Sequence, residues 1–209
     1  MSFDPNKISQ KHVLDAVARI EKDFKDEIGT LHGKALNNAR LNGGALELDG
    51  KSAYVATAPL TKELKAKTLE AWVKLDNLQR GGGAAISLQS NDGVKFDAIV
   101  FAESEPGRWM AGSEGYARTK SFGGDEEKQA KEQFIHVAIV YKEDGTITGY
   151  RNGRPYGKSY QSKPTSFSPG NHHVLFGMRH GTKAGGNLML EGKIDRAQLY
   201  DRALTAKEI

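Results

Sequence analysis

Residues 133–160 read QFIHVAIVYKEDGTITGYRNGRPYGKSY, and this stretch indicates the fold more directly than any other part of the chain. Apolar residues occupy every second position at its start, which places them on one side of an extended strand. These residues are Ile135, Val137, Ile139 and Tyr141. An Asp-Gly turn follows at 144–145, and Asn152-Gly153 then supplies two positions that tolerate a positive φ. The stretch therefore predicts three antiparallel strands joined by two tight turns.

Short apolar segments separated by turn residues continue through most of the chain after residue 29. In residues 67–75, four apolar side chains alternate with Thr68, Glu70, Trp72 and Lys74, so one face of that strand is expected to lie in a core. The 24 glycines suit a protein with many turns between short strands. The other predicted strands are 31–36, 44–48, 53–56, 84–89, 94–101, 109–113, 174–179 and 193–200. Such a series predicts two antiparallel sheets packed face to face.

The N-terminal segment has a different pattern. Its apolar residues are spaced by three or four positions, which predicts one amphipathic helix over residues 9–28, ended by Gly29. The residues of this stripe are Val13, Val17, Ile20, Phe24 and Ile28. We therefore divide the chain into an N-terminal helix and linker, residues 1–29, and a β-sandwich domain, residues 30–209.

Composition narrows the functional classes. The chain has no cysteine, so a disulfide framework, thiolate metal sites and a cysteine nucleophile are excluded. Its 30 basic and 26 acidic residues are interleaved, which favours a mixed solvated surface over a nucleic-acid interface. No apolar run approaches the roughly 18 residues that a membrane helix needs, and the first residues lack the apolar region of a signal peptide. We expect the chain to be a piece of a longer protein.

Four motifs occur in a familiar order. They are LELDGKSAYV at 46–55, TLEAWV at 68–73, FIHVAIVYKEDGTITGYRNGRPYG at 134–157 and GKIDRAQLYDRALTAKEI at 192–209. With them the chain resembles the laminin-G-like domains of the concanavalin A-like lectin/glucanase superfamily, over about residues 30–209. The resemblance implies an all-β fold, an antiparallel β-sandwich of the jelly-roll type. Because a fold hosts many functions, it does not name a ligand.

The resemblance also implies that one sheet is concave and that glycans bind across it in lectins and glucanases. In strand 94–101 and its extension, Asp97 and Glu103 share a face with apolar residues, and a buried carboxylate needs a partner. Two interpretations stay open: a salt-bridged network on the sheet face, or a polar groove in which such pairs hold sugar hydroxyls while an aromatic ring stacks on the sugar. The candidate ligand-binding residues are Asp97, Glu103, Trp109, Tyr116, Arg118, Arg151, Tyr156, Arg179 and His180.

An enzyme is not predicted. The retaining glucanases of this fold carry Glu-x-Asp-x-x-Glu on one strand, which holds two carboxylates on one face. Here the nearest approach is Glu103-Ser-Glu105, and Pro106 ends the strand before a third acid. The other close acids, Asp125 to Glu127, lie in a predicted loop with no strand register to align them. We assign no catalytic residue.

Metal binding divides into two cases. His172 and His173 are adjacent in an extended segment and point to opposite faces, and His136 is expected to be satisfied by a neighbour, so a transition-metal centre is not predicted. The resemblance implies a structural Ca²⁺ held by Asp195 and the segment Asp49-Gly50. The alternative, equally open, is that Asp195 hydrogen-bonds to loop amides or pairs with an arginine. No cofactor is required.

The leading hypothesis is a non-catalytic module of a larger secreted or cell-surface protein, which binds carbohydrate or another extracellular ligand. Its partners would be that ligand and the neighbouring domains, with no nucleic acid and no membrane segment, and its location extracytoplasmic. The first alternative is a structural or protein-interaction domain that docks onto its neighbours. The second alternative, a glycoside hydrolase, lacks the acid motif described above.

Overall fold

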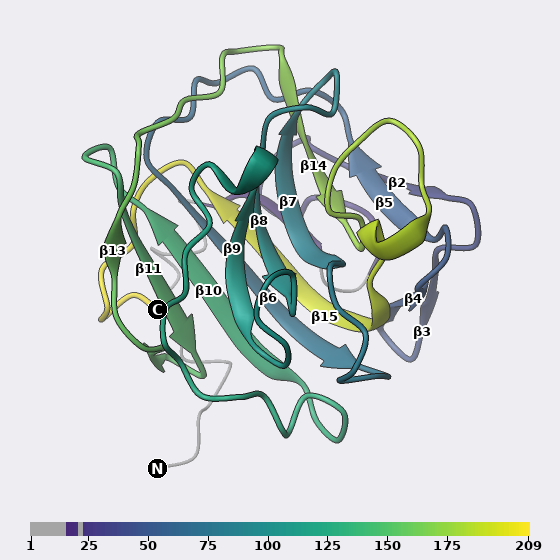
Figure 1. The fold of residues 1–209 in the computed structure, drawn as a ribbon. Coiled ribbons are helices and arrows are strands. Elements are labelled where there is room, and N and C mark those ends of the chain that lie inside the picture. Colours follow the sequence, from purple (N-terminus) through teal and green to yellow (C-terminus); the bar gives the residue numbers. More distant parts are fainter. Residues whose placement is uncertain (1–15, 21–22) are drawn as a thin grey trace.

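The computed structural model describes residues 16–20 and 23–209, and these form two antiparallel sheets packed face to face (Figure 1). The strands are β1 (Ala16–Ile20), β2 (Gly33–Leu36), β3 (Arg40–Asn42), β4 (Ala45–Asp49), β5 (Tyr54–Thr57), β6 (Lys67–Leu75), β7 (Ala84–Ser90), β8 (Phe96–Phe101), β9 (Trp109–Ser113), β10 (Ile135–Tyr141), β11 (Thr146–Arg151), β12 (Arg154–Pro155), β13 (Tyr160–Gln161), β14 (His172–Phe176) and β15 (Glu191–Tyr200). Two short 3₁₀ helices accompany them, η2 (Glu114–Tyr116) and η3 (Gly186–Leu188). The predicted fold class, an antiparallel β-sandwich of the jelly-roll type, is confirmed.

The two sheets differ in size. Sheet A has the order β12-β11-β10-β6-β15-β4-β3, with β1 also paired to β15 and β13 to β11. Sheet B has the order β2-β5-β14-β7-β8-β9. Strands that are neighbours in space are often distant in sequence, so the short local hairpins are held together by long-range pairing, as between β6 and β15.

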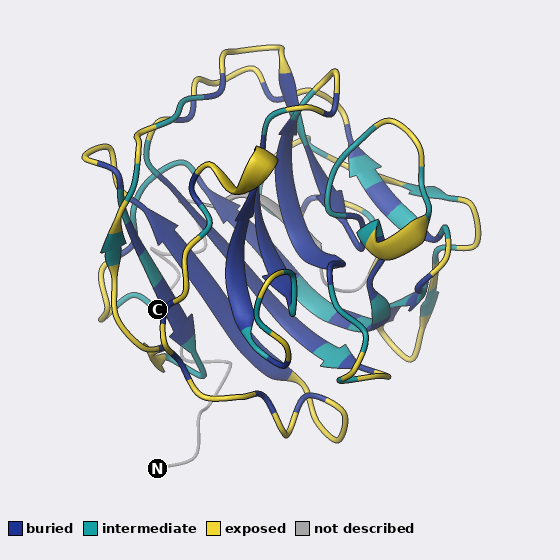
Figure 2. Ribbon diagram, viewed as in Figure 1, coloured by how far each residue is buried: buried dark blue, intermediate teal, exposed yellow. Residues whose placement is uncertain are grey.

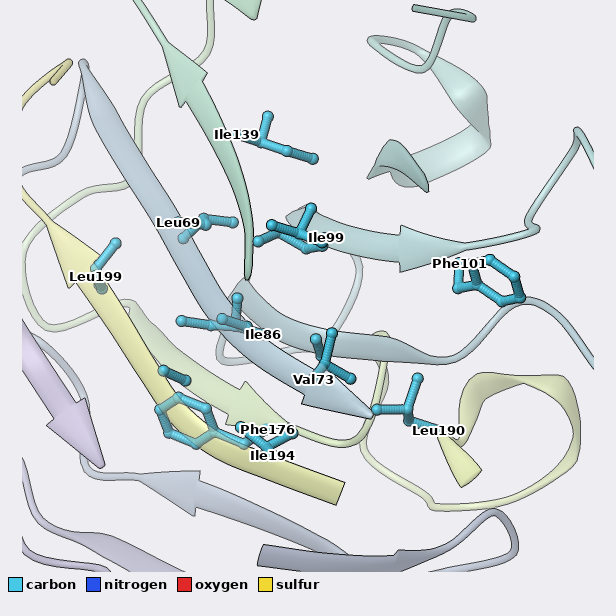
Figure 3. Packing of buried hydrophobic residues seen from close by; sticks show 14 of the residues in the cluster. Leu69, Val73, Ile86, Ile99, Phe101, Ile139, Phe176, Leu190, Ile194 and Leu199 are labelled. Atoms are coloured by element: carbon cyan, nitrogen blue, oxygen red, sulfur yellow. The ribbon is translucent and has the colours of Figure 1, made fainter. Parts of the chain in front are cut away.

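The core fills the space between the sheets. Leu69 and Val73 of β6 approach Ile86 and Ile99 of sheet B (Figure 3), and all four side chains have no exposed surface. The alternation predicted for residues 67–75 is confirmed, because Leu69, Ala71, Val73 and Leu75 all belong to this core. Burying one such aliphatic side chain stabilises the fold by roughly 1.5–3 kcal/mol. Figure 2 shows the result: the central strands are buried and the exposed residues gather in the connections.

The central hairpins follow the prediction closely. Strands β10, β11 and β12 are joined by the two expected turns, and at the second turn Asn152 and Gly153 have φ values of 49° and 72°. The Asn152 side chain also accepts a hydrogen bond from the backbone N–H of His136, at 3.0 Å, which ties the turn to the start of β10. His136 itself is satisfied by a neighbour as expected, with its Nε2 3.2 Å from Glu70 Oε1.

The predicted N-terminal helix is wrong where the structure describes it. Residues 16–20 form strand β1 along β15, and residues 23–28 contain no helix. The exposed backbone of β15 offers hydrogen bonds to an extended segment, and tertiary pairing of this kind overrides a weak helical pattern. The remaining residues of the predicted helix lie outside the described residues.

Candidate functional site

The outer face of sheet B is the face on which the resemblance places glycans. Phe96, Ala98 and Val100 of β8 point to this side and form an apolar cluster with Ala84, separate from the main core. Ala84, Ala98 and Val100 have no exposed surface, so other parts of the chain cover this side of β8. His180, for example, stacks on Phe96 with the ring centroids 4.3 Å apart. The centre of this face is therefore covered.

Glu103 and Arg179 close the same face. Arg179 Nη1 donates to Glu103 Oε1 at 2.8 Å, and both side chains are largely buried. Burial raises the pKa of the Glu103 carboxyl, and the Arg179 guanidinium opposes that shift. The loop between β14 and β15 carries η3 (Figure 1). Met178 and Met189 of this loop belong to one buried cluster with Leu175 of β14. The Glu103–Arg179 ion pair agrees with the first of the two interpretations, a salt-bridged sheet face.

Asp97 lies on the other side of β8, inside the sandwich. Its carboxylate accepts a hydrogen bond from Arg118 Nε at 2.8 Å and lies 2.8 Å from Lys67 Nζ of β6. Asp97 and Lys67 have no exposed surface, so the pair links the two sheets through the interior. Placing Asp97 and Arg118 on an open ligand face was wrong, because β8 turns residue 97 inward together with Ile99 and Phe101.

Two of the three aromatic residues predicted to stack on sugar are core residues. Trp109 is 2% exposed and Tyr156 6% exposed, so neither ring offers a face to a ligand. Tyr156 is held by its hydroxyl, which donates to the Asp125 carbonyl at 2.5 Å. The stacking role predicted for Trp109 and Tyr156 is thus incompatible with their burial. Tyr116 is 55% exposed and has a φ of 58°, an uncommon backbone conformation for a bulky residue.

Glu127 organises the region where Trp109, Arg151 and Tyr156 meet. Its carboxylate accepts hydrogen bonds from Trp109 Nε1 at 3.0 Å and from Arg151 Nε and Nη2 at 2.7 and 2.9 Å. The backbone N–H groups of Gln129 and Ala130 donate to the same carboxylate. Although burial opposes it, these donors, with Arg151 first among them, lower the pKa of Glu127 to about 2. Glu127 therefore stays ionised at neutral pH.

The segment around Glu127 joins the edges of the two sheets. It runs between η2 and β10, past β9 at the edge of sheet B (Figure 1). Backbone hydrogen bonds attach it on both sides, from Glu127 N–H to the Gly107 carbonyl and from Lys158 N–H to the Phe122 carbonyl. Sequence reasoning missed Glu127, because a run of acids in a loop has no periodicity that would distinguish the buried one.

Above Glu127 lies a pocket of about 560 Å³, which we call the edge pocket. Its lining residues are Asp125, Glu126, Lys128, Gln129, Arg151, Arg154, Pro155 and Tyr156. Arg151 is fixed in the pocket wall, because it donates to Gln129 Oε1 at 2.8 Å as well as to Glu127. Of the candidate residues, the structure thus brings Arg151 and Tyr156 together here, with Trp109 directly beneath.

The residues proposed for calcium lie at separate positions along the β4–β15 pairing. Asp49 lies opposite Glu191 in the β4–β15 pairing, four positions along β15 from Asp195. The Asp49 Oδ1 atom already accepts backbone N–H groups from Lys51, Ser52 and Ala53, and these lower its pKa to about 2 although desolvation opposes them. Gly50 has a φ of 64° in that turn. Among the described residues, no group of three or more acidic or histidine side chains is arranged to hold a metal ion. Calcium binding stays a prediction, without support from these contacts.

A second pocket, of about 420 Å³, lies at the opposite edge of sheet A beside β3 and β4. Its partly exposed acid Glu47 is shared among Lys193, Asn42 and Arg40, which lower the pKa of Glu47 to about 2. These interactions all serve to pair neighbouring strands, since Arg40, Glu47 and Lys193 lie opposite one another in the sheet. Strand pairing therefore accounts for the charged group around Glu47 in this pocket.

Comparison with solved structures identifies several similar folds. Domain 4 of AbnA, a GH43 extracellular arabinanase from Geobacillus stearothermophilus in complex with arabinotriose, has a TM-score of 0.70 and 16% identity, covering 93% of this chain and 96% of that one. The sialidase of Trypanosoma rangeli has a TM-score of 0.66 and 16% identity, covering 93% of this chain, which spans 32% of the sialidase structure. A pentraxin of Limulus polyphemus has a TM-score of 0.61 and 20% identity, covering 77% and 76%.

Three further findings bear on the family and on the membrane. No curated protein matches it. In the described part of the chain, no helix has the length and apolar character needed to cross a bilayer. The family model of the concanavalin A-like lectin/glucanases superfamily, in its laminin G form, matches residues 49–209. The chain therefore belongs to the concanavalin A-like lectin/glucanase superfamily.

Proposed function

We propose that this chain is a non-catalytic carbohydrate-binding module and that the edge pocket is its binding site. The observation that carries the proposal is the pocket of about 560 Å³ whose wall is fixed by the Glu127 network. Its volume lies within the roughly 300–1,000 Å³ usual for ligand sites. Because Arg151 is held at both Glu127 and Gln129, the wall needs no reordering when a ligand binds.

The chemistry of the lining suits a neutral sugar. Asp125 and Glu126 are exposed acceptors, whereas Lys128 and Arg154 are exposed donors. A sugar hydroxyl both donates and accepts, so it can use both kinds of group. The formal charges of these four residues cancel, which favours an uncharged ligand over an anionic one.

The similar structures support carbohydrate in general as the ligand class, and the arabinanase domain supports a neutral one. The similar arabinanase domain was solved with arabinotriose and the sialidase with a sialic acid derivative. The ligand-binding domain of botulinum neurotoxin serotype D, at a TM-score of 0.58 and 14% identity, was solved with N-acetylneuraminic acid. These identities indicate a shared fold, so the carbohydrate assignment to the present chain is our proposal.

The ionised state of the buried acid supports the non-catalytic proposal. A glycoside hydrolase needs one carboxylic acid that is protonated near neutral pH to donate to the leaving group. Glu127, the buried acid of the edge pocket, has a pKa of about 2 and is saturated with donors. We therefore expect no release of reducing ends from arabinan, xylan or β-glucan. Measurable release that disappears in Glu126→Gln would favour the hydrolase alternative.

The binding test is affinity electrophoresis in gels containing arabinan, xylan or β-glucan. We expect at least one polysaccharide to retard the protein, and Lys128→Ala/Arg154→Ala to weaken that binding roughly tenfold. The matched control, Lys131→Ala/Lys158→Ala, removes two exposed lysines that do not line the pocket and should change affinity less than about twofold. Absence of retardation by every polysaccharide, or an equal loss in both double variants, would contradict the proposal.

On this proposal the module belongs to a larger secreted or cell-surface protein, in which it holds the parent protein at its polysaccharide. The alternative, a structural domain that docks onto neighbouring domains, predicts no glycan binding at all. The same electrophoresis series therefore separates the two functions.

A further inference from the structure

A narrow crevice opens at one end of the sandwich, where the β10–β11 turn meets residues 163–165. Five of its ten lining residues are cations and none is acidic. The cations are Lys65, Lys67, Arg118, Lys142 and Lys163. We call this site the lysine crevice.

The floor of the lysine crevice is buried and charged. Lys67 has no exposed surface and lies 2.8 Å from Asp97, which also holds Arg118. Glu114 binds Arg118 from the outer side, at 2.6 Å, so the two floor cations are balanced by two carboxylates. The floor therefore carries no net charge of its own, and attraction for an anion comes from the rim.

The rim carries exposed lysines from separate segments. Lys142 follows β10, Lys163 precedes Pro164, and Lys65 precedes β6. Lys65 has a partial partner, Glu63, at 3.5 Å, with both side chains about half exposed. In the turn itself, the Asp144 carboxylate accepts the Thr146 backbone N–H and lines no part of the crevice.

Tyr141 provides a second, independent observation. Its side chain is 3% exposed and lines the crevice, yet its hydroxyl has no hydrogen-bond partner among the described residues. An unsatisfied buried hydroxyl is unfavourable, and such groups usually have a partner. Burial raises the pKa of Tyr141 well above its ordinary value, so this hydroxyl stays protonated and can act as a donor.

The volume of the lysine crevice indicates which chemical group the Tyr141 hydroxyl can contact. The crevice holds about 10 Å³, which is room for about one oxygen atom rather than for a sugar ring. One oxygen of a carboxylate or sulfate fits that space, with the rest of the group outside between the rim lysines. We infer that the lysine crevice binds the carboxylate or sulfate groups of an acidic polysaccharide, an inference that rests on the proposed carbohydrate-binding function.

The two oxyanions are distinguished by the probe. Binding of the full chain to a heparin oligosaccharide, which is sulfated, and to an oligogalacturonate, which carries carboxylates, is measured by calorimetry at about 50 and about 200 mM NaCl. We expect at least one acidic probe to bind. Lys142→Gln/Lys163→Gln should lower the affinity for that probe roughly tenfold. The charge-matched control Lys183→Gln/Lys207→Gln should change the affinity less than about twofold.

Tyr141→Phe tests the buried donor. Tyr141→Phe should lower the affinity for the acidic probe by a factor of about three relative to the parent chain. It should leave the free energy of unfolding unchanged or higher, because it removes only an unsatisfied hydroxyl. Unchanged affinity in Tyr141→Phe would mean that the hydroxyl meets only water, and would overturn its role. Equal losses in the two lysine double variants, or no binding of either acidic probe, would overturn the inference as a whole.

Failure of this inference differs from failure of the proposed function. If neutral polysaccharides bind through the edge pocket but acidic probes do not bind, the lysine crevice is not a site and the proposed function stands. If acidic probes bind through Lys142 and Lys163 while neutral ones fail, the crevice stands and the edge pocket does not.

Discussion

Asp97 and Glu127 are two buried carboxylates that the same fold uses in different ways. Asp97 has no exposed surface and Glu127 is 3% exposed, and each is paired with an arginine at 2.7–2.8 Å. Asp97 lies between the sheets, where its second partner is the buried Lys67. Glu127 lies at the edge of the sandwich, where its other donors are neutral N–H groups and the edge pocket lies above it.

This difference separates a buried charge that mainly stabilises the fold from one that also positions the wall of the edge pocket. Arg118 also pairs with Glu114, but the buried Lys67 pairs with Asp97, so loss of Asp97 leaves Lys67 charged or forces it to lose a proton. Burial already lowers the pKa of Lys67, and Asp97 opposes that shift. Around Glu127 the five donors fix a loop and an arginine side chain, so its loss chiefly loosens the wall of the edge pocket. We expect the first carboxylate to matter for folding and the second for folding and binding.

The largest effect is expected from Asp97→Ala. Removing one partner of a buried ion pair costs about 3–5 kcal/mol, because the remaining charge is left without compensation. Urea unfolding should show this loss in the free energy of unfolding. The double variant Lys67→Met/Asp97→Asn removes the stranded lysine charge as well and should recover part of the loss. A loss below about 1 kcal/mol in Asp97→Ala would contradict the role of Asp97 as a link between the sheets.

Glu127→Gln should cost about 3 kcal/mol, since hydrogen bonds to a charged acceptor contribute about 1.5–3 kcal/mol each and are not additive. The glutamine keeps the size of the side chain but turns one acceptor into a donor that faces other donors. Glu126→Gln is the control, because Glu126 is exposed and should stay within about 0.5 kcal/mol of the parent. Calorimetry with the bound polysaccharide should also show weaker binding in Glu127→Gln. Equal stability of the two variants would mean that the Glu127 network is not formed in solution.

The two carboxylates also show how far sequence reasoning reaches. The alternation in residues 67–75 and 133–160 predicts the sheets because strand burial has a period of two residues. The same reasoning identified Asp97 as needing a partner, and it placed Arg118 with Asp97 among the candidate residues of the ligand face. It could not determine which face of β8 is inside, so it assigned Asp97 to the ligand face. Register is set by pairing across the sheet, which a single strand does not encode.

Loops and the chain start were less predictable for a different reason. Glu127 lies in a segment with no periodicity, and its burial follows from Trp109 and Arg151, which are distant in sequence. The N-terminal stripe fitted a helix locally, but the free edge of β15 pairs with residues 16–20. In both cases long-range contacts decide the structure. The site therefore had to be found from the geometry, whereas the fold did not.

The dependence of the unfolding free energy on pH tests the role of Glu127 separately from that of Asp97. The ordinary carboxyl pKa of 4.5 falls to about 2 in the folded protein, so the stabilisation is fully present above pH 4.5 and is lost as the pH falls toward 2. Between pH 7 and pH 3 this residue alone should account for about 2 kcal/mol of lost stability. Urea unfolding at both pH values measures it as the difference between the parent and Glu127→Gln, which cancels the contribution of other acids. If the difference between them does not narrow at pH 3, the pKa of Glu127 is not depressed.

The smallest effect concerns Tyr156, which connects the Glu127 network to the outer wall of the edge pocket. Its hydroxyl donates to the Asp125 carbonyl and accepts the backbone N–H of Trp109 at 3.4 Å. Tyr156→Phe removes both contacts and keeps the ring, so it should cost about 1 kcal/mol of unfolding free energy. Tyr116→Phe is the matched control, because Tyr116 is 55% exposed and should lose almost nothing.

The binding consequence of Tyr156→Phe separates the wall of the pocket from its lining charges. Without the hydroxyl, the Asp125 backbone is released while Lys128 and Arg154 keep their places, so affinity for a neutral polysaccharide should fall by a factor of about three to five and its dependence on salt should stay the same. A change in salt dependence would mean that the charged residues had moved as well. That result would mean that the pocket wall and its lining charges move together. It would weaken the distinction between the Asp97 ion pair, which stabilises the fold, and the Glu127 network, which positions the pocket.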